Sequence, residues 1–398
     1  MLYIAAISLG LLAGYANIPL LKPLGLLIAE IFIRIFKCLS LPLIALSIIV
    51  TLANFHTEKM LQRVWRYALR YTFGTTLVAA IVSCLLYLLI QPQLIEVPKP
   101  HSLPATGAEQ FNYLNYLMQL IPSNPLSPFL ENQVLGVILL SFVIGIATCC
   151  IPEKDAKDTL IQFFNSLHRL LMVITHWIIR FIPIGLFGFI TVTAAKFQGG
   201  VVFGGLGEYL SVIILANLIQ GLIILPLWLK FHGVAPFTAF RNMLPALQVA
   251  FFCKSSVATL PITIRASEEK LSIHPNISRF VLPLCTSLNM NGCAAFIFVT
   301  VTYLMQNHGI HIGLTTMGLW ILIATLAAIG NAGVPMGCFF LSASLLTSMN
   351  VPIALMGIIL PFYTLIDMLE TALNVWSDIC VTKVVNDQVT KDIGLQKP

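Results

Sequence analysis

Long apolar stretches alternate with short polar connections along almost the whole chain. A helix needs about 20 residues to cross the hydrocarbon core of a bilayer, and eight of the stretches reach or approach that length. They lie near residues 2–16, 24–53, 68–91, 132–151, 163–195, 202–231, 278–305 and 351–388. The pattern predicts an all-α polytopic membrane protein with eight transmembrane helices.

Two further apolar stretches, residues 238–270 and 317–349, follow a different pattern. Each has two arms that are too short to span a bilayer alone, on either side of a polar or glycine-rich centre. The centres are "KSS", which Pro261 follows shortly, and "GNAGVPMG". Irregular backbone at membrane depth survives only where protein covers it or where it lines a wet cavity. We therefore predict two re-entrant helical hairpins, and two ordinary proline-kinked spans are the alternative.

Basic residues give the chain an orientation. The connection at 55–70 has four basic residues against one acid, whereas the connection at 92–131 has one lysine against three acids. The positive-inside bias places the first connection in the cytoplasm, and eight crossings then leave both termini on that side. The first hairpin would open from the cytoplasm and the second from outside, which is the arrangement of an inverted repeat.

The last predicted span carries a run of polar side chains in "DMLETALNVWSD". On a helix with 3.6 residues per turn, five of them fall within one arc of about 100°. These are Asp367, Glu370, Thr371, Asn374 and Asp378. Apolar residues cover the remaining surface, so this stripe is predicted to face protein. Carboxylates in such a place must be paired, protonated or bound to a cation.

The seventh span has a complementary set of polar side chains in "LCTSLNMNGCAAF". The set comprises Thr286, Ser287, Asn289 and Asn291, with Gly292 as the expected helix interruption. Oxygen-rich side chains and unwound carbonyls suit a hard cation such as Na⁺. Hydrogen bonding between helices is the alternative for single Thr or Ser residues. It does not account for three acids on one apolar helix.

Composition excludes an ordinary soluble domain. The chain is 58% hydrophobic and 10% charged, with a mean hydropathy of +0.91, whereas soluble domains are about 25% charged. The nine cysteines show neither paired spacing nor a CxxC, so we interpret them as buried small hydrophobes rather than a disulfide or metal framework. The N-terminus lacks the basic region of a cleavable signal and is interpreted as a first span. The net charge of +6 reflects topology rather than nucleic-acid binding.

Four motifs, in this order, resemble those of the dicarboxylate/amino acid:cation symporter family, the glutamate transporter homologues. They are "FFCKSSVATLP", "NMNGC", "GNAGVPMG" and "DMLETALNVWSD", and the similarity extends over nearly all 398 residues. The resemblance implies a homotrimer whose protomers each have a scaffold, about 1–67 and 92–200, and a transport part, about 68–91 and 201–388. Substrate would cross by an elevator-like slide of the transport part, with the second hairpin as the external gate.

The resemblance also implies roles for particular residues. The α-carboxylate of the substrate would be held at the hairpin tips, its amino group by Asp367, and the remainder of the cradle would come from the last span. Matched to this site are Lys254, Ser255, Ser256, Val334, Pro335, Gly337, Asp367, Glu370, Thr371 and Asn374. Asp378, with carbonyls near Asn289 and Asn374, matches one sodium site. Ser287, with backbone of the second hairpin, matches another.

Three departures from the family pattern matter. Asn291 replaces the acid of a further, deep sodium site, whose other wall Tyr71 and Thr75 would represent, so we expect fewer coupled sodium ions. Glu370 stands where many members that carry acidic substrates have an arginine, and the run "ETALN" is similar to bacterial sodium:serine/threonine symporters. Met336 and Cys338 stand where the second tip commonly has glycines, which would stiffen or narrow the gate.

These features predict a symporter that moves an amino acid into the cell with Na⁺, or alternatively H⁺, without a cofactor or nucleic-acid partner. Glu370 would repel a carboxylate on the substrate, which favours small neutral amino acids such as serine, threonine and alanine. Lys254 could pair with Glu370 or attract an anion, so glutamate, aspartate or a C4-dicarboxylate is the alternative. An intramembrane enzyme has less support, because no GxGD or HExxH motif is present. An ion channel, which the family can resemble through its anion leak, is a further, less favoured class. The expected location is the lipid bilayer of the bacterial inner membrane.

Overall fold

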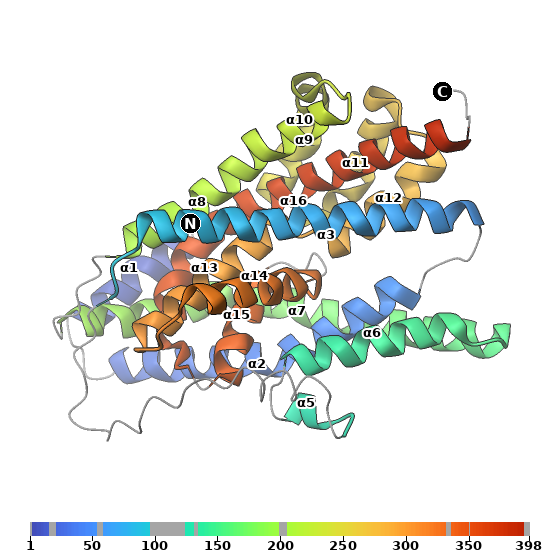
Figure 1. Cartoon of the computed structure of the whole chain (residues 1–398). Coiled ribbons are helices and arrows are strands. Elements are labelled where there is room, and N and C mark those ends of the chain that lie inside the picture. The colour runs from blue at the N-terminus through green and yellow to red at the C-terminus, as the bar shows by residue number, and fades with distance from the viewer. Residues whose placement is uncertain are drawn as a thin grey trace.

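The computed structural model of the chain is helical throughout the part that it describes (Figure 1). The described residues are 2–15, 21–53, 59–95, 124–130, 134–198, 205–331, 336–349 and 351–393. Within these ranges no strand is present. The predicted fold class is confirmed to this extent.

Four helices from the first half of the chain pack against one another. They are α1 (Leu2–Tyr15), α2 (Leu21–Ala53), α6 (Val134–Cys150) and α7 (Lys154–Gln198), and a short α5 (Ser127–Leu130) lies beside α6. Close approach of α2 and α7 depends on small residues, since a Cβ at Gly188 would lie 2.8 Å from the backbone nitrogen of Ala29. Glycine at helix contacts is typical of membrane proteins, where packing rather than water drives association.

A second group of helices packs around α16 and α13. It contains α3 (Lys59–Ile90), α8 (Leu206–Ile219), a π-helical turn (Gln220–Ile224), α9 (Leu225–Phe231), α10 (Pro236–Cys253), α11 (Ser256–Leu271), α12 (Pro275–Leu288), α13 (Asn291–Asn307), α14 (Leu314–Ile329), α15 (Gly337–Ser348), a 3₁₀ turn (Ile353–Leu355) and α16 (Met356–Ile393). In Figure 1, α3 and α16 run along much of the molecule, with α8 to α10 on one side and α2, α6 and α7 on the other. Helix α15 contacts both α2 and α6, so it joins the two groups.

Four helical stretches of the described residues are long and apolar enough to cross a membrane. They are Arg63–Ile90, Leu206–Phe231, Pro275–Asn307 and Met356–Asp392. Shorter apolar helices occupy Gly136–Cys150, Leu314–Ile329 and Gly337–Ser348. Each of these stretches falls on a span or hairpin arm predicted from the sequence.

Helix α3 begins earlier than the apolar pattern indicated. The segment 55–70 was expected to be a connection, but α3 already starts at Lys59 and carries Arg63, Arg66 and Arg70 on its first turns. The hydrophobic pattern marks only the part of a helix that would lie in hydrocarbon, and a helix continues past that part at little cost when its surface is polar. The predicted apolar span at 68–91 therefore lies within α3, but the prediction that 55–70 is a connection was wrong, because the helix begins at Lys59.

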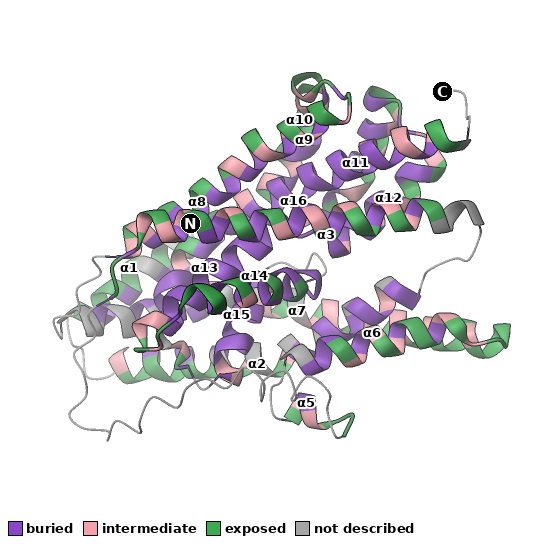
Figure 2. Cartoon of the chain, in the orientation of Figure 1, coloured by how far each residue is buried: buried purple, intermediate pink, exposed green. Residues whose placement is uncertain are grey.

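Buried residues concentrate in the second group (Figure 2). Nearly every residue of α13, and most of α15, is buried, whereas α1, α2 and α6 expose many leucines and isoleucines. An apolar exposed surface is what a protein presents to lipid. Helix α13 is therefore enclosed by other helices, and it is the element against which the polar face of α16 packs.

Both predicted hairpins are interrupted helix pairs. Hairpin one consists of α10 and α11, which pack on each other and are broken at Lys254–Ser255. Hairpin two consists of α14 and α15, which both pack on α13. At the far end of hairpin one, Arg279 of α12 donates two hydrogen bonds to the Glu268 carboxylate. Arg279 Nε lies 3.0 Å from Oε1, and Arg279 Nη2 lies 3.1 Å from Oε2. This hydrogen bonding holds the pKa of Glu268 below its usual range and anchors hairpin one to α12.

Candidate functional site

The polar stripe of α16 faces the interior of the protein, as the sequence predicted. We call the five side chains the α16 stripe, and none is more than 6% exposed. They are Asp367, Glu370, Thr371, Asn374 and Asp378. Two irregular segments of backbone lie against the stripe: the α12–α13 break, which contacts Asp378 and Asn374, and the tip of hairpin two beside Asp367.

The break between α12 and α13 lies at Asn289 and Met290, directly opposite Asp378. The Asn289 amide nitrogen donates to Asp378 Oδ1 at 3.0 Å and to the Ser377 hydroxyl at 2.9 Å. The Asn289 amide oxygen accepts from Thr75 of α3 at 2.9 Å. Asn289 thus connects α3, the helix break and α16, and all of its polar atoms are buried. Unwound backbone beside a carboxylate is the arrangement that binds small cations in transporters.

Gly292 was expected to interrupt the helix, but it lies in the first turn of α13. Its lack of a side chain serves close packing instead. A Cβ at Gly292 would lie 2.8 Å from both Asn217 Oδ1 and the Glu370 Cα atom. The Gly292 backbone N–H donates to Asn374 Oδ1 at 2.8 Å, a bond that only this close approach permits.

Several buried oxygens around the break have no hydrogen-bond partner. Asn291 donates its amide nitrogen to Ser377, which leaves the Asn291 amide oxygen unpaired, and the oxygen of Asn217 beside Gly292 is also unpaired. Most buried polar atoms in proteins are hydrogen-bonded. Unpaired acceptor oxygens next to a carboxylate therefore suit a hard cation, as the composition of this segment predicted. Ser287, the other predicted sodium ligand, is half-buried in the last turn of α12, two residues before the break.

The tip of hairpin two contacts Asp367. Met336 adopts a left-handed backbone conformation, φ 59°, that is uncommon for a residue with a side chain. Its backbone N–H approaches the Asp367 carboxyl. Gly337 follows, and a Cβ there would overlap Asn331, since it would lie 1.5 Å from the amide oxygen. Val334 and Pro335, the other predicted residues of this tip, lie outside the described residues.

The tip of hairpin one is built by its own backbone. Lys254 ends α10 in the left-handed conformation, φ 54°, and the Ser255 hydroxyl caps α11 by accepting from the Ala258 N–H at 3.2 Å. Ser256 is buried and Lys254 is partly exposed. The positive charge of Lys254 acts on Asp367, and within the described residues Lys254 forms no ion pair with Glu370. The pairing considered from the sequence is therefore not formed.

Glu370 is the least satisfied acid of the α16 stripe. One of its oxygens accepts a long hydrogen bond, 3.4 Å, from the Tyr363 hydroxyl. The other oxygen is buried and has no partner. Thr371, beside it, donates to the Asp367 carbonyl at 2.7 Å. A buried carboxyl with an unpaired oxygen is costly in a stable fold, which indicates that Glu370 is retained for what it binds or excludes.

Two cysteines sit next to Glu370, contrary to the expectation that no cysteine is paired. The sulfurs of Cys293 on α13 and Cys338 on α15 are paired, with a Cα–Cα distance of 5.5 Å. Asn331 Nδ2 lies 3.0 Å from the first sulfur and 3.3 Å from the second. The partners are 45 residues apart in the chain, so sequence spacing carries no sign of the pairing.

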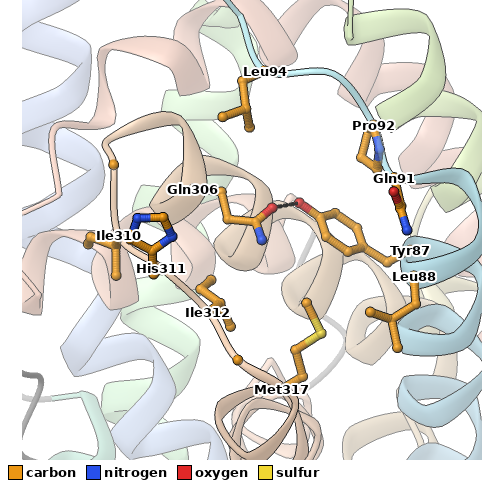
Figure 3. Close-up of a pocket in the computed structure, with 12 residues that line it drawn as sticks. Tyr87, Leu88, Gln91, Pro92, Leu94, Gln306, Ile310, His311, Ile312 and Met317 are labelled. Carbon is orange, nitrogen blue, oxygen red and sulfur yellow. Dashed lines mark hydrogen bonds between the residues drawn. The ribbon is translucent and has the colours of Figure 1, made fainter.

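A separate cavity of about 590 Å³ opens beside the ends of α3 and α13 (Figure 3). Figure 3 shows Tyr87 and Gln306 pointing toward each other in its lining, and the Tyr87 hydroxyl donates to Gln306 Oε1 at 2.5 Å. The segment that leads into α14, including His311, forms another wall. No residue of the α16 stripe lines this cavity, so it is distinct from the candidate site.

Comparison with known proteins identifies a family for the chain. Residues 1–388 match the model of the sodium:dicarboxylate symporter family. The neutral amino acid transporter B(0) of Oryctolagus cuniculus is 29% identical over 416 residues, which cover 94% of this chain and 76% of that protein.

Two other relatives are similar over comparable lengths. The neutral amino acid transporter A of Homo sapiens is 27% identical and covers 88% of this chain and 73% of its own length. The excitatory amino acid transporter 3 of Mus musculus is also 27% identical, with 92% and 79% covered. The family match over nearly the whole chain, together with helices apolar enough to span a bilayer, makes this chain a multi-pass membrane transporter. It belongs to the sodium:dicarboxylate symporter family.

Proposed function

We propose that the protein is a secondary active symporter that moves a small neutral amino acid into the cell, coupled to Na⁺ or, alternatively, to H⁺. One observation carries the proposal: the buried α16 stripe lies against two interruptions of helical backbone, the α12–α13 break and the tip of hairpin two, and one carboxylate oxygen of its Glu370 has no partner. Backbone interruptions supply N–H groups and carbonyls free to bind a zwitterion and cations together.

The substrate cradle that we propose lies between the hairpin tips and α16. Asp367 would bind the α-amino group, and the α-carboxylate would meet the N-terminal ends of α11 and α15, where backbone N–H groups favour an anion. Ser255 and Ser256 would contribute from hairpin one, and the segment from Val334 to Gly337 from hairpin two. Thr371 and Asn374 would complete the cradle. The Met336 N–H approaches the Asp367 carboxyl, which supports placing the second tip there.

Sodium would be held one turn farther along α16. We propose Asp378, the carbonyls near Asn289 and Asn374, and separately Ser287 with hairpin two, as two sites. The contact between Asn289 and Asp378 supports the first. Thr75 reaches the same break, but Asn291 brings no negative charge there, so we expect fewer coupled sodium ions than in members with an acid at this position.

The substrate class depends on Glu370. Two like charges 4 Å apart repel by about 4 kcal/mol at an effective dielectric of 20, which is close to a factor of 1,000 in affinity. An ionised Glu370 would therefore exclude substrates that carry a second carboxylate. The names of the transporters B(0) and A among the relatives support neutral substrates.

An acidic amino acid or a C4-dicarboxylate is the second candidate. Lys254 favours it, because its ammonium group stands at the first hairpin tip and its charge reaches Asp367. The similarity to excitatory amino acid transporter 3 is consistent with it. However, the positive charge of Lys254 acts on Asp367, and within the described residues Lys254 forms no ion pair with Glu370. It would therefore not neutralise an ionised Glu370.

The two packed groups of helices suggest how substrate would cross. We propose that the first group, together with the start of α3, is a scaffold, about 1–67 and 92–200, that forms a homotrimer. The second group, about 68–91 and 201–388, would slide as an elevator, with hairpin two as the external gate. Both hairpins would be re-entrant between eight spans, with both termini in the cytoplasm of a bacterium and the transporter in its inner membrane.

Uptake into proteoliposomes tests the proposal. Labelled serine, alanine, threonine, aspartate and glutamate are offered under an inward Na⁺ gradient and, separately, under a pH gradient. We expect saturable serine uptake that requires one of the two gradients, which neither a channel nor an enzyme would show. Aspartate uptake that excess serine leaves unaffected would overturn the neutral-substrate assignment.

A further inference from the structure

The paired cysteines join two elements that have different roles in the proposed transport cycle. Cys293 is the third residue of α13, inside the enclosed core, and Cys338 is the second residue of α15, immediately after the tip of hairpin two. Their Cα atoms lie 5.5 Å apart, within the range of about 4.4 to 6.8 Å that a disulfide requires. The backbone therefore already holds the two residues in a position to bond.

The surroundings of the pair place it at the centre of the gate. Asn331, on the other side of the hairpin-two tip, donates to both sulfurs, and Asn374 of the α16 stripe donates to Cys293 at 3.4 Å. Both sulfurs and a Glu370 carboxylate oxygen lie within 4.8 Å of one another. Hairpin two, α13 and α16 all meet at this point, so a covalent bond here fixes the tip of hairpin two against the cradle.

We propose that Cys293 and Cys338 are a site of oxidative modification that latches hairpin two. Oxidation to a disulfide ties the gate to α13 and stops transport, and reduction releases it. The inference rests on the proposed function, in which hairpin two opens during each cycle. A lid that cannot open stops turnover even when the binding site is intact.

The oxidant is a small peroxide that reaches the thiols when the tip opens. Two thiols and one hydrogen peroxide give one disulfide and two water molecules: the O–O bond breaks, the S–S bond forms, and both thiol protons end on the peroxide oxygens. Two equivalents of a small thiol reverse the step by exchange and are themselves oxidised to a disulfide. The remaining seven cysteines form no disulfide.

The test compares oxidised and reduced protein in proteoliposomes. Alkylation of the denatured protein and mass spectrometry should count nine reactive cysteines after reduction and seven after peroxide treatment. We expect peroxide to lower serine uptake by about tenfold or more, as for a blocked lid, and reduction to restore it. Cys293→Ser and Cys338→Ser should each abolish the peroxide effect, measured against the untreated uptake of the same variant. Cys84→Ser, which removes a buried thiol of α3, should retain it.

Hydrogen exchange separates the latch from the proposed function. Oxidation should slow amide exchange in 336–349, and this readout does not depend on which substrate is carried. A reduced protein that takes up no amino acid would overturn the proposed function, while the exchange measurement would still decide the latch. Loss of two reactive cysteines without slower exchange, or with unchanged uptake in a transporting protein, would overturn the latch, as would peroxide inhibition that persists in Cys338→Ser.

Discussion

Glu370 and Asp378 occupy the same polar face of one helix, two turns apart, yet their surroundings differ. Asp378 accepts a hydrogen bond from Asn289, whereas one oxygen of Glu370 has no partner. Both are buried in a segment where an uncompensated charge is expensive. A residue retained under those conditions is a candidate for function, and the two environments predict different phenotypes.

Glu370→Gln should relax discrimination against acidic substrates. Glutamine keeps the size of the side chain and removes the charge that would repel a second carboxylate by about 4 kcal/mol at 4 Å. We expect the inhibition constant of aspartate against serine uptake to fall by about 100-fold or more. Glu208→Gln removes a partly exposed acid outside the α16 stripe, one that accepts the Gln93 N–H, and should leave selectivity unchanged. Equal exclusion of aspartate by both variants would show that Glu370 does not set the substrate class.

Asp378→Asn should weaken activation by sodium more than it changes substrate preference. The amide preserves the shape and the hydrogen bond acceptor but brings no charge to the cation. We expect the Na⁺ concentration for half-maximal serine uptake to rise by about tenfold or more, in line with the cost of a lost ligand charge, while serine and alanine keep their relative rates. Asp387→Asn is the control, because that acid lies on the same helix and pairs with Lys383 at 2.9 Å. If the Na⁺ concentration for half-maximal uptake is the same in both variants, Asp378 is not a ligand of the ion.

At the scale of helices, the contact of α13 with α16 depends on one glycine. Gly292→Ala places a methyl group 2.8 Å from the Glu370 Cα atom, and a backbone atom cannot move aside as a side chain tip can. We expect a lower midpoint of thermal unfolding and a loss of uptake, since overpacking typically costs about 1 to 3 kcal/mol.

Gly318→Ala is the matched control for that substitution. It lies in helix α14, and a Cβ there would have no atom within 4 Å. Alanine favours a helix over glycine by up to about 1 kcal/mol, so the control should unfold at the same temperature or higher. If the two variants have the same unfolding midpoint, α13 and α16 can move apart at Gly292 to accommodate a methyl group at no cost in stability.

Periodicity and composition predicted the helical elements and the buried face of α16, because a polar arc on an apolar helix has only one favourable direction. They also predicted both hairpin interruptions, where proline, glycine or serine marks the break. They did not predict that α12 ends at Leu288, since Asn289 and Met290 do not break helices by propensity. The break depends on bonds to α3 and α16 that exist only in the folded protein.

The pairing of Cys293 with Cys338 is a tertiary property of the same kind. Only these two of the nine cysteines directly follow a glycine, but that local context does not indicate a partner 45 residues away. The substrate cradle was predicted by resemblance rather than by periodicity, and its Val334 and Pro335 lie outside the described residues. The unpaired oxygen of Glu370 could not be predicted from the sequence either, because it depends on where Tyr363 and α13 lie in the folded protein.

For the molecule as a whole, the proposed elevator requires the surface between the two helix groups to slide. Hairpin two touches the first group at Gly330, where a Cβ would lie 3.1 Å from the Ile44 Cγ2 atom of α2 and 3.7 Å from Ile138 of α6. Gly330 has an ordinary helical conformation, so a cysteine is compatible with its backbone. The Cβ atoms of positions 44 and 330 can therefore approach the separation of about 3.5 to 4.5 Å that suits a disulfide.

Ile44→Cys combined with Gly330→Cys, in a Cys338→Ser background that removes the native pair, should produce a reducible tether between α2 and hairpin two. If the second group must slide past the first, the oxidised double variant will bind serine but not transport it, and reduction will restore transport. Each single cysteine variant controls for oxidation elsewhere. Binding, followed as a serine-dependent rise in the unfolding midpoint, distinguishes a blocked slide from a damaged cradle. If the fully cross-linked protein transports serine as fast as the same variant does after chemical reduction, the sliding motion is contradicted, because this tether spans the surface along which the two groups must move.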